Sequence, residues 1–358
     1  MQLRIGTRKG LFIFDQTAAG QWRAQAPVLL GDPVTMLLTD PRNGDQYAAL
    51  NLGHFGVKLY RAEPGCADWY EISTPAFPKT DADDGPAVQQ IWELSPGGDD
   101  QPGTLWAGTI PGGLFKSTDR GDSWQLIESL WARPERERWF GGGYDAPGIH
   151  SICVHPGDGD RLSLAISCGG VWETADGGAS WSQTGQGLRA AFLPPDQAYD
   201  PVSQDPHRMV RCAAAPDRLW IQHHNGIFRS DDGGRHFTEI GEAGPSVFGF
   251  AVAVHPADPD CAWFVPAVKD ECRVPVNARL VVTRTRDGGR SFETLGAGLP
   301  AAPAYDLAYR HALDVHASGN LLAFGSTTGG LWISEDQGDH WQCLSSHLPP
   351  INVVRFDP

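Results

Sequence analysis

Short apolar runs that end in polar turns recur along this chain. Each run contains or follows a glycine, as in GGLFK, GGVWE, NGIFR and GGLWI, and each is followed by an octapeptide of the form Ser/Thr-x-Asp-x-Gly-x-x-aromatic. Five copies begin at residues 117, 174, 230, 285 and 334, so that successive copies start 57, 56, 55 and 49 residues apart. An even recurrence of this length is typical of a repeat architecture in which every repeat is one supersecondary unit.

The octapeptide has the residues that a tight turn between two strands requires. Its aspartate can accept hydrogen bonds from backbone N–H groups of the same hairpin, and its glycine tolerates a positive φ. The closing Trp or Phe then anchors the outgoing strand in the core. We interpret these turns as structural because the aspartates satisfy their own hairpins; they are Asp119, Asp176, Asp232, Asp287 and Asp336.

Each repeat contains four short strands, which in one repeat are IHSICVHP, LSLAIS, VWETA and WSQTG. The first strand recurs at the C-terminus as INVVRFDP, whereas the N-terminus starts with the second strand, and pairing of these ends would complete the first repeat. The sequence therefore predicts one all-β domain over residues 1–358, a seven-bladed β-propeller, with six blades as the alternative if the degenerate second repeat is an insertion. The predicted blades are 351–358 with 2–28, 33–73, 87–130, 149–188, 208–243, 247–299 and 305–348.

The long insertions fall on one face of this propeller, opposite the octapeptide turns. They are residues 74–88, 131–148, 189–207 and 266–279. Long loops on a rigid scaffold are where binding residues usually lie. We therefore predict a ligand pocket on this face, at the mouth of the central channel, formed by His54, Trp92, Tyr144, His207, Arg208, His223, His224, Asn225, Lys269, Asp270, Arg273 and Asp306.

Acidic and basic groups on this face suggest hydrolytic chemistry. Asp145, His150 and Glu271 are the catalytic candidates, since carboxylates and an imidazole that face one another across a pocket can transfer protons. The alternative is chance, because a chain with 43 acidic residues places some of them on any face. No GxSxG, HExxH or phosphate-binding glycine loop accompanies these residues.

Histidines on the same face suggest a metal as a second possibility. Neutral imidazoles suit divalent transition metals, and a propeller axis can collect one histidine from each blade. The alternative is that these histidines are hydrogen-bonded loop residues. A divalent metal is the one cofactor that the sequence suggests, with His54, His150, His223 and His224 as its candidate ligands.

Composition and charge limit the partners. A net charge of −15 argues against nucleic acid and anionic membrane surfaces, which require clustered Lys and Arg. The N-terminus, MQLRIGTRKG, lacks the apolar stretch of a secretory signal, and no stretch approaches 18 apolar residues. The seven cysteines contain no CxxC pair, which fits a reducing cytoplasm.

The octapeptide resembles the Asp-box, or BNR repeat, of sialidase-type β-propellers. Stretches such as NLGHFGVKLYR, WFGGGYDAPGIHSI and GLRAAFLP are similar to a widespread group of bacterial sialidase-like or glycosyl-hydrolase-like proteins over nearly the whole length. For a sialidase, the resemblance implies arginines that hold a carboxylate and a tyrosine nucleophile. Leu3-Arg4-Ile5-Gly6 is the nearest string to the arginine motif, with Arg208, Arg273 and Arg310 as further arginines and Tyr144, Tyr199 and Tyr305 as tyrosines.

Three functions remain open from the sequence. The first is binding of a small molecule or glycan, with hydrolase-like activity, which the aromatic residues Trp92, Trp131, Trp139 and Tyr144 favour. The second is a platform for protein partners, for which the acidic loop DADDG (81–85) and the segment WARPERERW (131–139) are candidates. The third is a metal site on the propeller axis.

Overall fold

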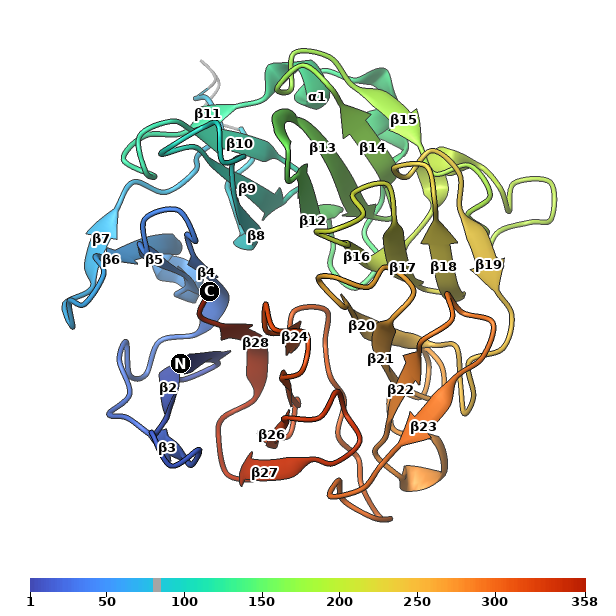
Figure 1. The fold of residues 1–358 in the computed structure, drawn as a ribbon. Helices are drawn as coiled ribbons and strands as arrows, with labels where there is room; N and C mark the ends of the chain where they lie inside the picture. The colour runs from blue at the N-terminus through green and yellow to red at the C-terminus, as the bar shows by residue number, and fades with distance from the viewer. Residues whose placement is uncertain (80–84) are drawn as a thin grey trace. The chain divides into compact units, whose positions relative to one another are not determined.

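Seven four-stranded antiparallel sheets account for nearly all the regular structure of this protein (Figure 1). They are the blades of a seven-bladed β-propeller, as the sequence predicts, and the six-bladed alternative is wrong. The computed structural model describes residues 1–79 and 85–358. In the described part of the chain the one α-helix is the single turn α1 (Glu128–Trp131), which is too short to cross a membrane.

The blades belong to two compact units, which we describe separately. Unit 1 comprises residues 1–34, 210–231 and 238–358, and unit 2 comprises residues 35–209 and 232–237. The chain passes from unit 2 to unit 1 within strand β16 (Pro206–Arg211).

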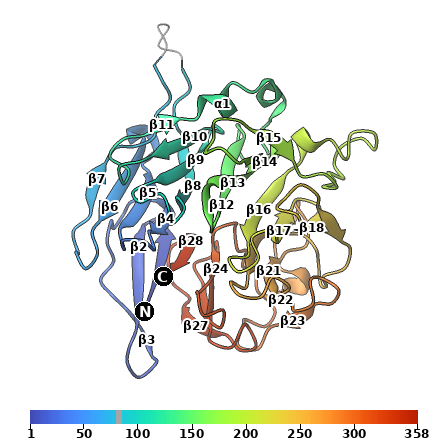
Figure 2. The same ribbon diagram turned by 45° about the horizontal axis from the view of Figure 1, so that its top comes forward.

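Unit 2 contains three sheets, except for Val34 at the start of β4, and the strands of each sheet lie side by side in chain order (Figure 2). The first is β4 (Val34–Thr39), β5 (Gln46–Asn51), β6 (Val57–Ala62) and β7 (Tyr70–Ile72). The second is β8 (Gln90–Pro96), β9 (Leu105–Ile110), β10 (Leu114–Ser117) and β11 (Gln125–Leu126). The third is β12 (Gly148–His155), β13 (Asp158–Ser167), β14 (Gly170–Thr174) and β15 (Ser182–Thr184).

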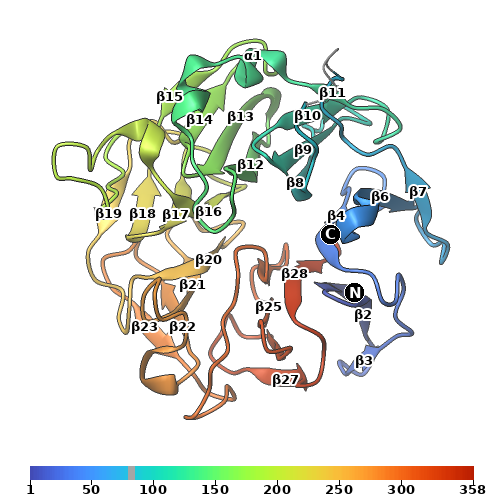
Figure 3. The same cartoon turned by 180° about the vertical axis from the view of Figure 1, so that it is seen from behind.

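Unit 1 contains the other sheets (Figure 3). Strands β17 (Leu219–His223), β18 (Gly226–Ser230) and β19 (Thr238–Ile240) complete the sheet that begins with β16. The next two sheets are β20 (Gly249–Val254), β21 (Ala262–Pro266), β22 (Val282–Thr285) and β23 (Glu293–Leu295), and then β24 (Leu313–Val315), β25 (Leu322–Gly325), β26 (Leu331–Ser334) and β27 (Gln342–Ser345). The last is made by β1 (Gln2–Thr7), β2 (Gly10–Gln16), β3 (Trp22–Ala24) and β28 (Ile351–Phe356).

Pairing of the chain ends closes this last sheet, as the sequence predicts. β28 lies antiparallel to β1, with Leu3 opposite Phe356 and Ile5 opposite Val354. The side chains of Ile351 and Val354 are buried against the β24–β27 blade, in a core that also contains Leu3 and Ile5. Burial of apolar side chains therefore holds the last strand of the chain in the first blade.

The five octapeptides, which we call box turns, share one hydrogen-bond pattern. In the first, Asp119 accepts bonds from the backbone N of Ser123 at 2.9 Å and from its Oγ at 2.6 Å. Ser117 Oγ donates to the same aspartate at 2.7 Å and accepts from Gly121 N at 2.8 Å. In two box turns a histidine replaces the serine, so that Nδ1 of His236 and of His340 bonds the carboxylate.

Each box turn also needs two successive residues with positive φ. The fifth residue is always glycine, but the fourth is glycine in only three copies and is Arg120 or Gln337 in the others, with φ values of 63° and 61°. The carbonyl of this fourth residue accepts hydrogen bonds from the preceding blade. Arg120 O accepts from Tyr47 Oη at 3.1 Å and from Arg61 Nη1 at 2.7 Å, and Gln337 O accepts from Trp263 Nε1 and Arg284 Nη1, both at 2.8 Å.

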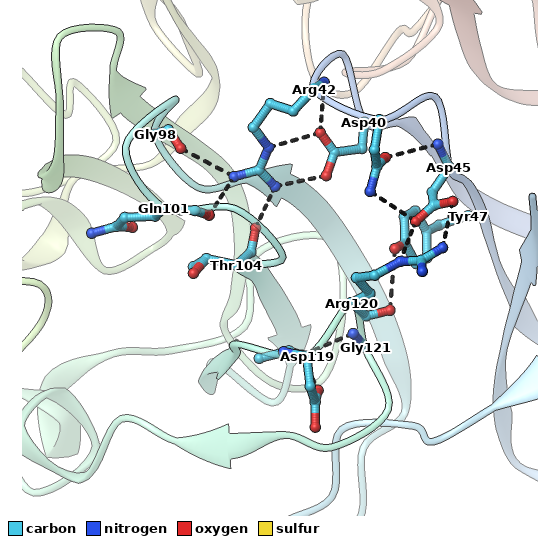
Figure 4. A network of polar contacts seen from close by, with 12 residues as sticks. Asp40, Arg42, Asp45, Tyr47, Gly98, Gln101, Thr104, Asp119, Arg120 and Gly121 are labelled. Carbon is cyan, nitrogen blue, oxygen red and sulfur yellow. Dashed lines mark hydrogen bonds and ion pairs between the residues drawn. The ribbon is translucent and has the colours of Figure 1, made fainter. Parts of the chain in front are cut away.

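In unit 2 the same arrangement extends into a polar network between the first two sheets (Figure 4). Arg42 is held by Asp40 at 2.6 Å and donates to the carbonyls of Gln101 and Thr104, both at 2.7 Å. Arg120 bonds Asp45 at 2.6 Å, and this hydrogen bond raises the pKa of the guanidinium. The network fixes neighbouring sheets to each other at the end of the blades that carries the box turns.

Candidate functional site

The end of the blades opposite the box turns contains a compact group of loops in unit 2. We call residues 139–148, 167–170 and 200–208 the loop cluster. Phe140 N donates to Cys168 O at 3.3 Å, and Gly170 N donates to Gln204 O at 3.1 Å. Two of the long insertions that the sequence predicts to be functional therefore meet at the β13–β14 hairpin.

Cation–π contacts stabilise the insertion of residues 131–148. The guanidinium carbon of Arg136 lies 3.3 Å from the ring centroid of Trp131 and 5.6 Å from that of Trp139. Burial between these rings lowers the pKa of Arg136 to about 10. Trp131 and Trp139 thus pack the insertion, a different use from the exposed aromatic platform that the sequence suggests.

A buried aspartate and histidine lie at the centre of the loop cluster. Asp205 and His207 are 5% and 2% exposed, and Asp205 Oδ2 lies 3.6 Å from His207 Nε2. The other carboxylate oxygen, Oδ1, accepts hydrogen bonds from Ser167 Oγ at 3.1 Å and from Cys168 N at 3.2 Å. These bonds orient the carboxylate so that Oδ2 faces the imidazole.

Gly142 covers this pair from the insertion above it. A Cβ at this position would lie 2.9 Å from Cys168 Sγ and 3.4 Å from Asp205 Oδ2. A larger residue would therefore displace the insertion, which explains why the sequence has glycine here.

His150 is fully buried and holds two strands together. Its Nε2 lies 2.8 Å from Pro206 O, which only accepts, so Nε2 carries the proton. Its Nδ1 lies 3.0 Å from Ser151 Oγ, which itself accepts from Met209 N at 3.0 Å. Both ring nitrogens are therefore engaged between β12 and β16, and this geometry favours a structural role over proton transfer or metal ligation.

Trp92 and Tyr144 form the aromatic part of the site. Their ring centroids lie 5.1 Å apart in an edge-to-face arrangement, and Trp92 contacts His150 in the same way at 5.4 Å. Trp92 is 6% exposed, whereas Tyr144 is 46% exposed. The ring of Tyr144 is therefore accessible and packs against the buried ring of Trp92.

Arg208 is linked to these aromatic residues through His150. It forms an ion pair with buried Glu93 and donates from Nη1 to His150 O at 2.7 Å. Asp145, the catalytic candidate next to Tyr144, is exposed on the loop cluster. His54 lies on an exposed turn, where its ring packs against that of Phe55 with the centroids 3.9 Å apart and the planes tilted by 39°.

In unit 1 three candidates lie in the β17–β18 hairpin. His223 is fully buried, and its Nδ1 accepts a hydrogen bond from Asn225 N at 3.2 Å. The ring of His224 contacts Phe248 edge to face at 6.0 Å.

The insertion between β21 and β22 carries a second group of unit 1 candidates. Arg273 bonds Asp270 at 2.5 Å and lies 5.2 Å from the ring centroid of Phe250. Lys269 and Glu271 are exposed and pair with each other at 3.5 Å. Hydrogen bonding from the Glu271 backbone N–H, followed by the charge of Lys269, lowers the pKa of Glu271. These ion pairs lie within one loop.

The remaining unit 1 candidate, Asp306, precedes the β24–β27 blade. Its Oδ1 accepts a hydrogen bond from Ser326 Oγ at 2.8 Å and another from Thr328 Oγ1. Arg310 is buried and lies 5.4 Å from the ring centroid of Phe250.

Arg4, the nearest match to the sialidase arginine, is a buried residue of β1. It bonds Asp357 at 2.9 Å, and burial lowers its pKa. Its side chain therefore braces the pairing of the two chain ends.

The acidic loop DADDG (81–85) is the sequence's candidate for binding a protein partner. Its residues 81–84 lie outside the described part of the chain.

Sequence reasoning missed Asp205, Glu93 and Gly142. Asp205 is two residues before His207, which the sequence did single out, and residues at this spacing on an extended chain share a face. Glu93 is a charged residue inside the apolar strand QIWELSP, which is a signal of a buried ion pair. Gly142 lies in a run of three glycines that only the fold connects to Asp205.

Comparison with known proteins supports the fold. No family model matches the chain, and no curated protein matches it. An ancestral GH74 enzyme is similar over 86% of this chain, with 16% identity and a TM-score of 0.60, and the chain spans 38% of that enzyme. A periplasmic gluconolactonase of Pseudomonas aeruginosa aligns over 99% of this chain and 98% of its own, with 12% identity and a TM-score of 0.59. YCF48 bound to a D1 peptide aligns over 96% and 83%, with 12% identity and a TM-score of 0.55.

Proposed function

We propose that the loop cluster of unit 2 binds a small polar ligand of the sugar class. The observation that carries this proposal is the pair formed by exposed Tyr144 and buried Trp92. Trp92 packs against His150, whose carbonyl accepts a hydrogen bond from Arg208. Sugars bind to aromatic faces through their apolar C–H surfaces and to neighbouring side chains through their hydroxyl groups.

The polar neighbours are already fixed in place. Arg208 is tethered by Glu93 and by His150 O, and Asp205 is held by Ser167 and Cys168. Side chains that are held in position lose little conformational freedom when a ligand binds, which favours affinity. The loop cluster therefore has the preorganisation of a binding site.

Hydrolase-like activity is the finer form of this proposal. Asp145, exposed beside Tyr144, is the residue we assign to proton transfer if the bound sugar is cleaved. The GH74 enzyme and the gluconolactonase share only the fold with this chain, so they motivate the choice of test compounds and no more.

The test is a binding screen with a panel of neutral and acidic oligosaccharides and sugar lactones, read by calorimetry and by product formation. For a ligand found with the wild type, we expect Tyr144→Ala to weaken binding about five- to thirtyfold, since loss of one stacked ring costs about 1–2 kcal/mol. Tyr199→Ala is the matched control, because Tyr199 is an exposed tyrosine on a different insertion of unit 2, residues 189–207. Equal affinity of both variants would refute the placement, and product formed equally by Asp145→Asn would refute the assignment of that residue.

A protein-binding platform is the second candidate function. Phe140, Phe192 and Tyr199 are large apolar residues on the insertions of unit 2 and are 40%, 43% and 61% exposed. YCF48, which shares the fold, was solved with a bound peptide. A stoichiometric partner that is lost on replacing Phe192 and Tyr199, together with no sugar binding, would favour this function over the first.

A further inference from the structure

We propose that Asp205 and His207 are two ligands of a divalent transition-metal site in unit 2. Their ligating atoms, Asp205 Oδ2 and His207 Nε2, lie 3.6 Å apart. This separation exceeds the usual length of a hydrogen bond between a nitrogen and an oxygen, which is about 2.7–3.2 Å. It equals the distance between two atoms that bind one ion at about 2.1 Å with an angle of about 118° at the metal.

The surroundings of Asp205 are those of a metal ligand. A ligating carboxylate or imidazole is commonly oriented by hydrogen bonds to its second atom. Here Ser167 Oγ and Cys168 N bond Oδ1 of Asp205, which leaves Oδ2 directed at the imidazole. Ser167 is therefore a positioning residue for the site.

Both residues lie deep in the protein, since Asp205 is 5% and His207 is 2% exposed. A divalent ion bound to Oδ2 would offset the cost of keeping an ionised carboxylate at this depth, with His207 as a neutral ligand.

The chemistry of the ligands indicates the class of metal. One imidazole with one carboxylate suits Zn²⁺, Co²⁺, Mn²⁺ or Fe²⁺ better than Ca²⁺, which prefers oxygen ligands alone. A functional site keeps further positions for water or for additional side chains.

The test uses the whole protein, stripped with a chelator and titrated with Zn²⁺ and with Co²⁺. We expect close to one ion per chain, with a visible Co²⁺ absorption spectrum that reports the ligand geometry. His207→Gln and Asp205→Asn should weaken Zn²⁺ binding at least 100-fold, and Ser167→Ala about tenfold.

The control is the exposed pair His236 and Asp232, whose atoms lie 2.7 Å apart in a box turn. His236→Gln should leave Zn²⁺ affinity unchanged. A stripped wild type that binds no Zn²⁺ or Co²⁺ would overturn the proposal, and so would equal affinity of the wild type and His207→Gln, both judged on variants with wild-type circular dichroism. Metal content is measured without any sugar, so this result is independent of whether the loop cluster binds one.

Discussion

His150 and His207 are both buried histidines of unit 2, yet their surroundings give them different roles. Both ring nitrogens of His150 are occupied by Pro206 O and Ser151 Oγ, which makes this residue a link between β12 and β16. His207 instead faces Asp205 Oδ2 at a distance too long for a hydrogen bond. The sequence singled out both histidines but gave no means of separating them. Pro206 O, which bonds His150, is 56 positions away, and Ser167 and Cys168, which orient Asp205, are 38 and 37 positions from it.

At the same scale, the box-turn carboxylates predict how stability depends on pH. Hydrogen bonds from the serine side chain and backbone lower the pKa values of Asp176 and Asp287 to about 2. Because these values lie below the unfolded value near 3.8, the carboxylates stabilise the fold above about pH 4, and this contribution is lost as the pH falls toward 2. We expect the thermal midpoint of the wild type to fall steeply between pH 4 and pH 2.

The double variant Asp176→Asn/Asp287→Asn should have a lower midpoint than the wild type at pH 6 and a shallower fall below pH 4. Asp99→Asn, at an exposed aspartate outside the box turns, is the control. If the wild-type and double-variant curves run parallel from pH 6 to pH 2, the pH argument fails.

At the scale of elements, the box turn closes its own hairpin and also links its blade to the preceding one. Only the first of these roles can be predicted from the sequence. The spacing of Asp and Gly predicts a turn that satisfies its own hairpin, because these contacts are local. The acceptance of hydrogen bonds by the fourth carbonyl is not visible in the sequence, since the donors Arg61 and Arg284 come from the preceding blade, more than 50 residues earlier. The positive φ of Arg120 and Gln337 was also missed, because glycine occupies the fourth position in the other three copies and non-glycine residues rarely adopt this conformation.

Loss of one such inter-blade link should destabilise the protein measurably. The Arg284 side chain is 3% exposed, donates to Gln337 O and forms ion pairs with Glu293 and Asp339 at 2.7 and 2.8 Å. Its replacement by methionine leaves a buried carbonyl without this donor, so we expect Arg284→Met to lower the free energy of unfolding of unit 1 by about 2 kcal/mol.

The measurement is urea denaturation followed by tryptophan fluorescence. Arg286→Met is the matched control, since the Arg286 side chain is 50% exposed and only approaches Glu293 at 3.7 Å; its effect should stay below about 0.5 kcal/mol. Equal effects of the two replacements would show that the carbonyl link contributes little.

For the whole molecule, the fold could be predicted from the sequence because the same pattern of strands and turns recurs in every repeat. Seven runs of strands and turns, with a first strand displaced to the C-terminus, determine the blade number and the pairing of β1 with β28. The site has no such repetition. Asp205, Gly142 and Glu93 come from three different connections or strands, and only their packing in unit 2 brings them beside residues that the sequence had selected.

The central claim is that the function of this protein lies in the loop cluster of unit 2, beside Trp92. The most direct measurement is the ¹⁹F NMR spectrum of protein labelled with 5-fluorotryptophan, titrated with the sugar panel, with the Trp92 signal assigned from its absence in Trp92→Phe. We predict that a binding sugar shifts the Trp92 signal at a concentration that leaves the signals of Trp22 and Trp263 unchanged. A bound sugar that shifts other tryptophans and leaves Trp92 unaltered would contradict the account.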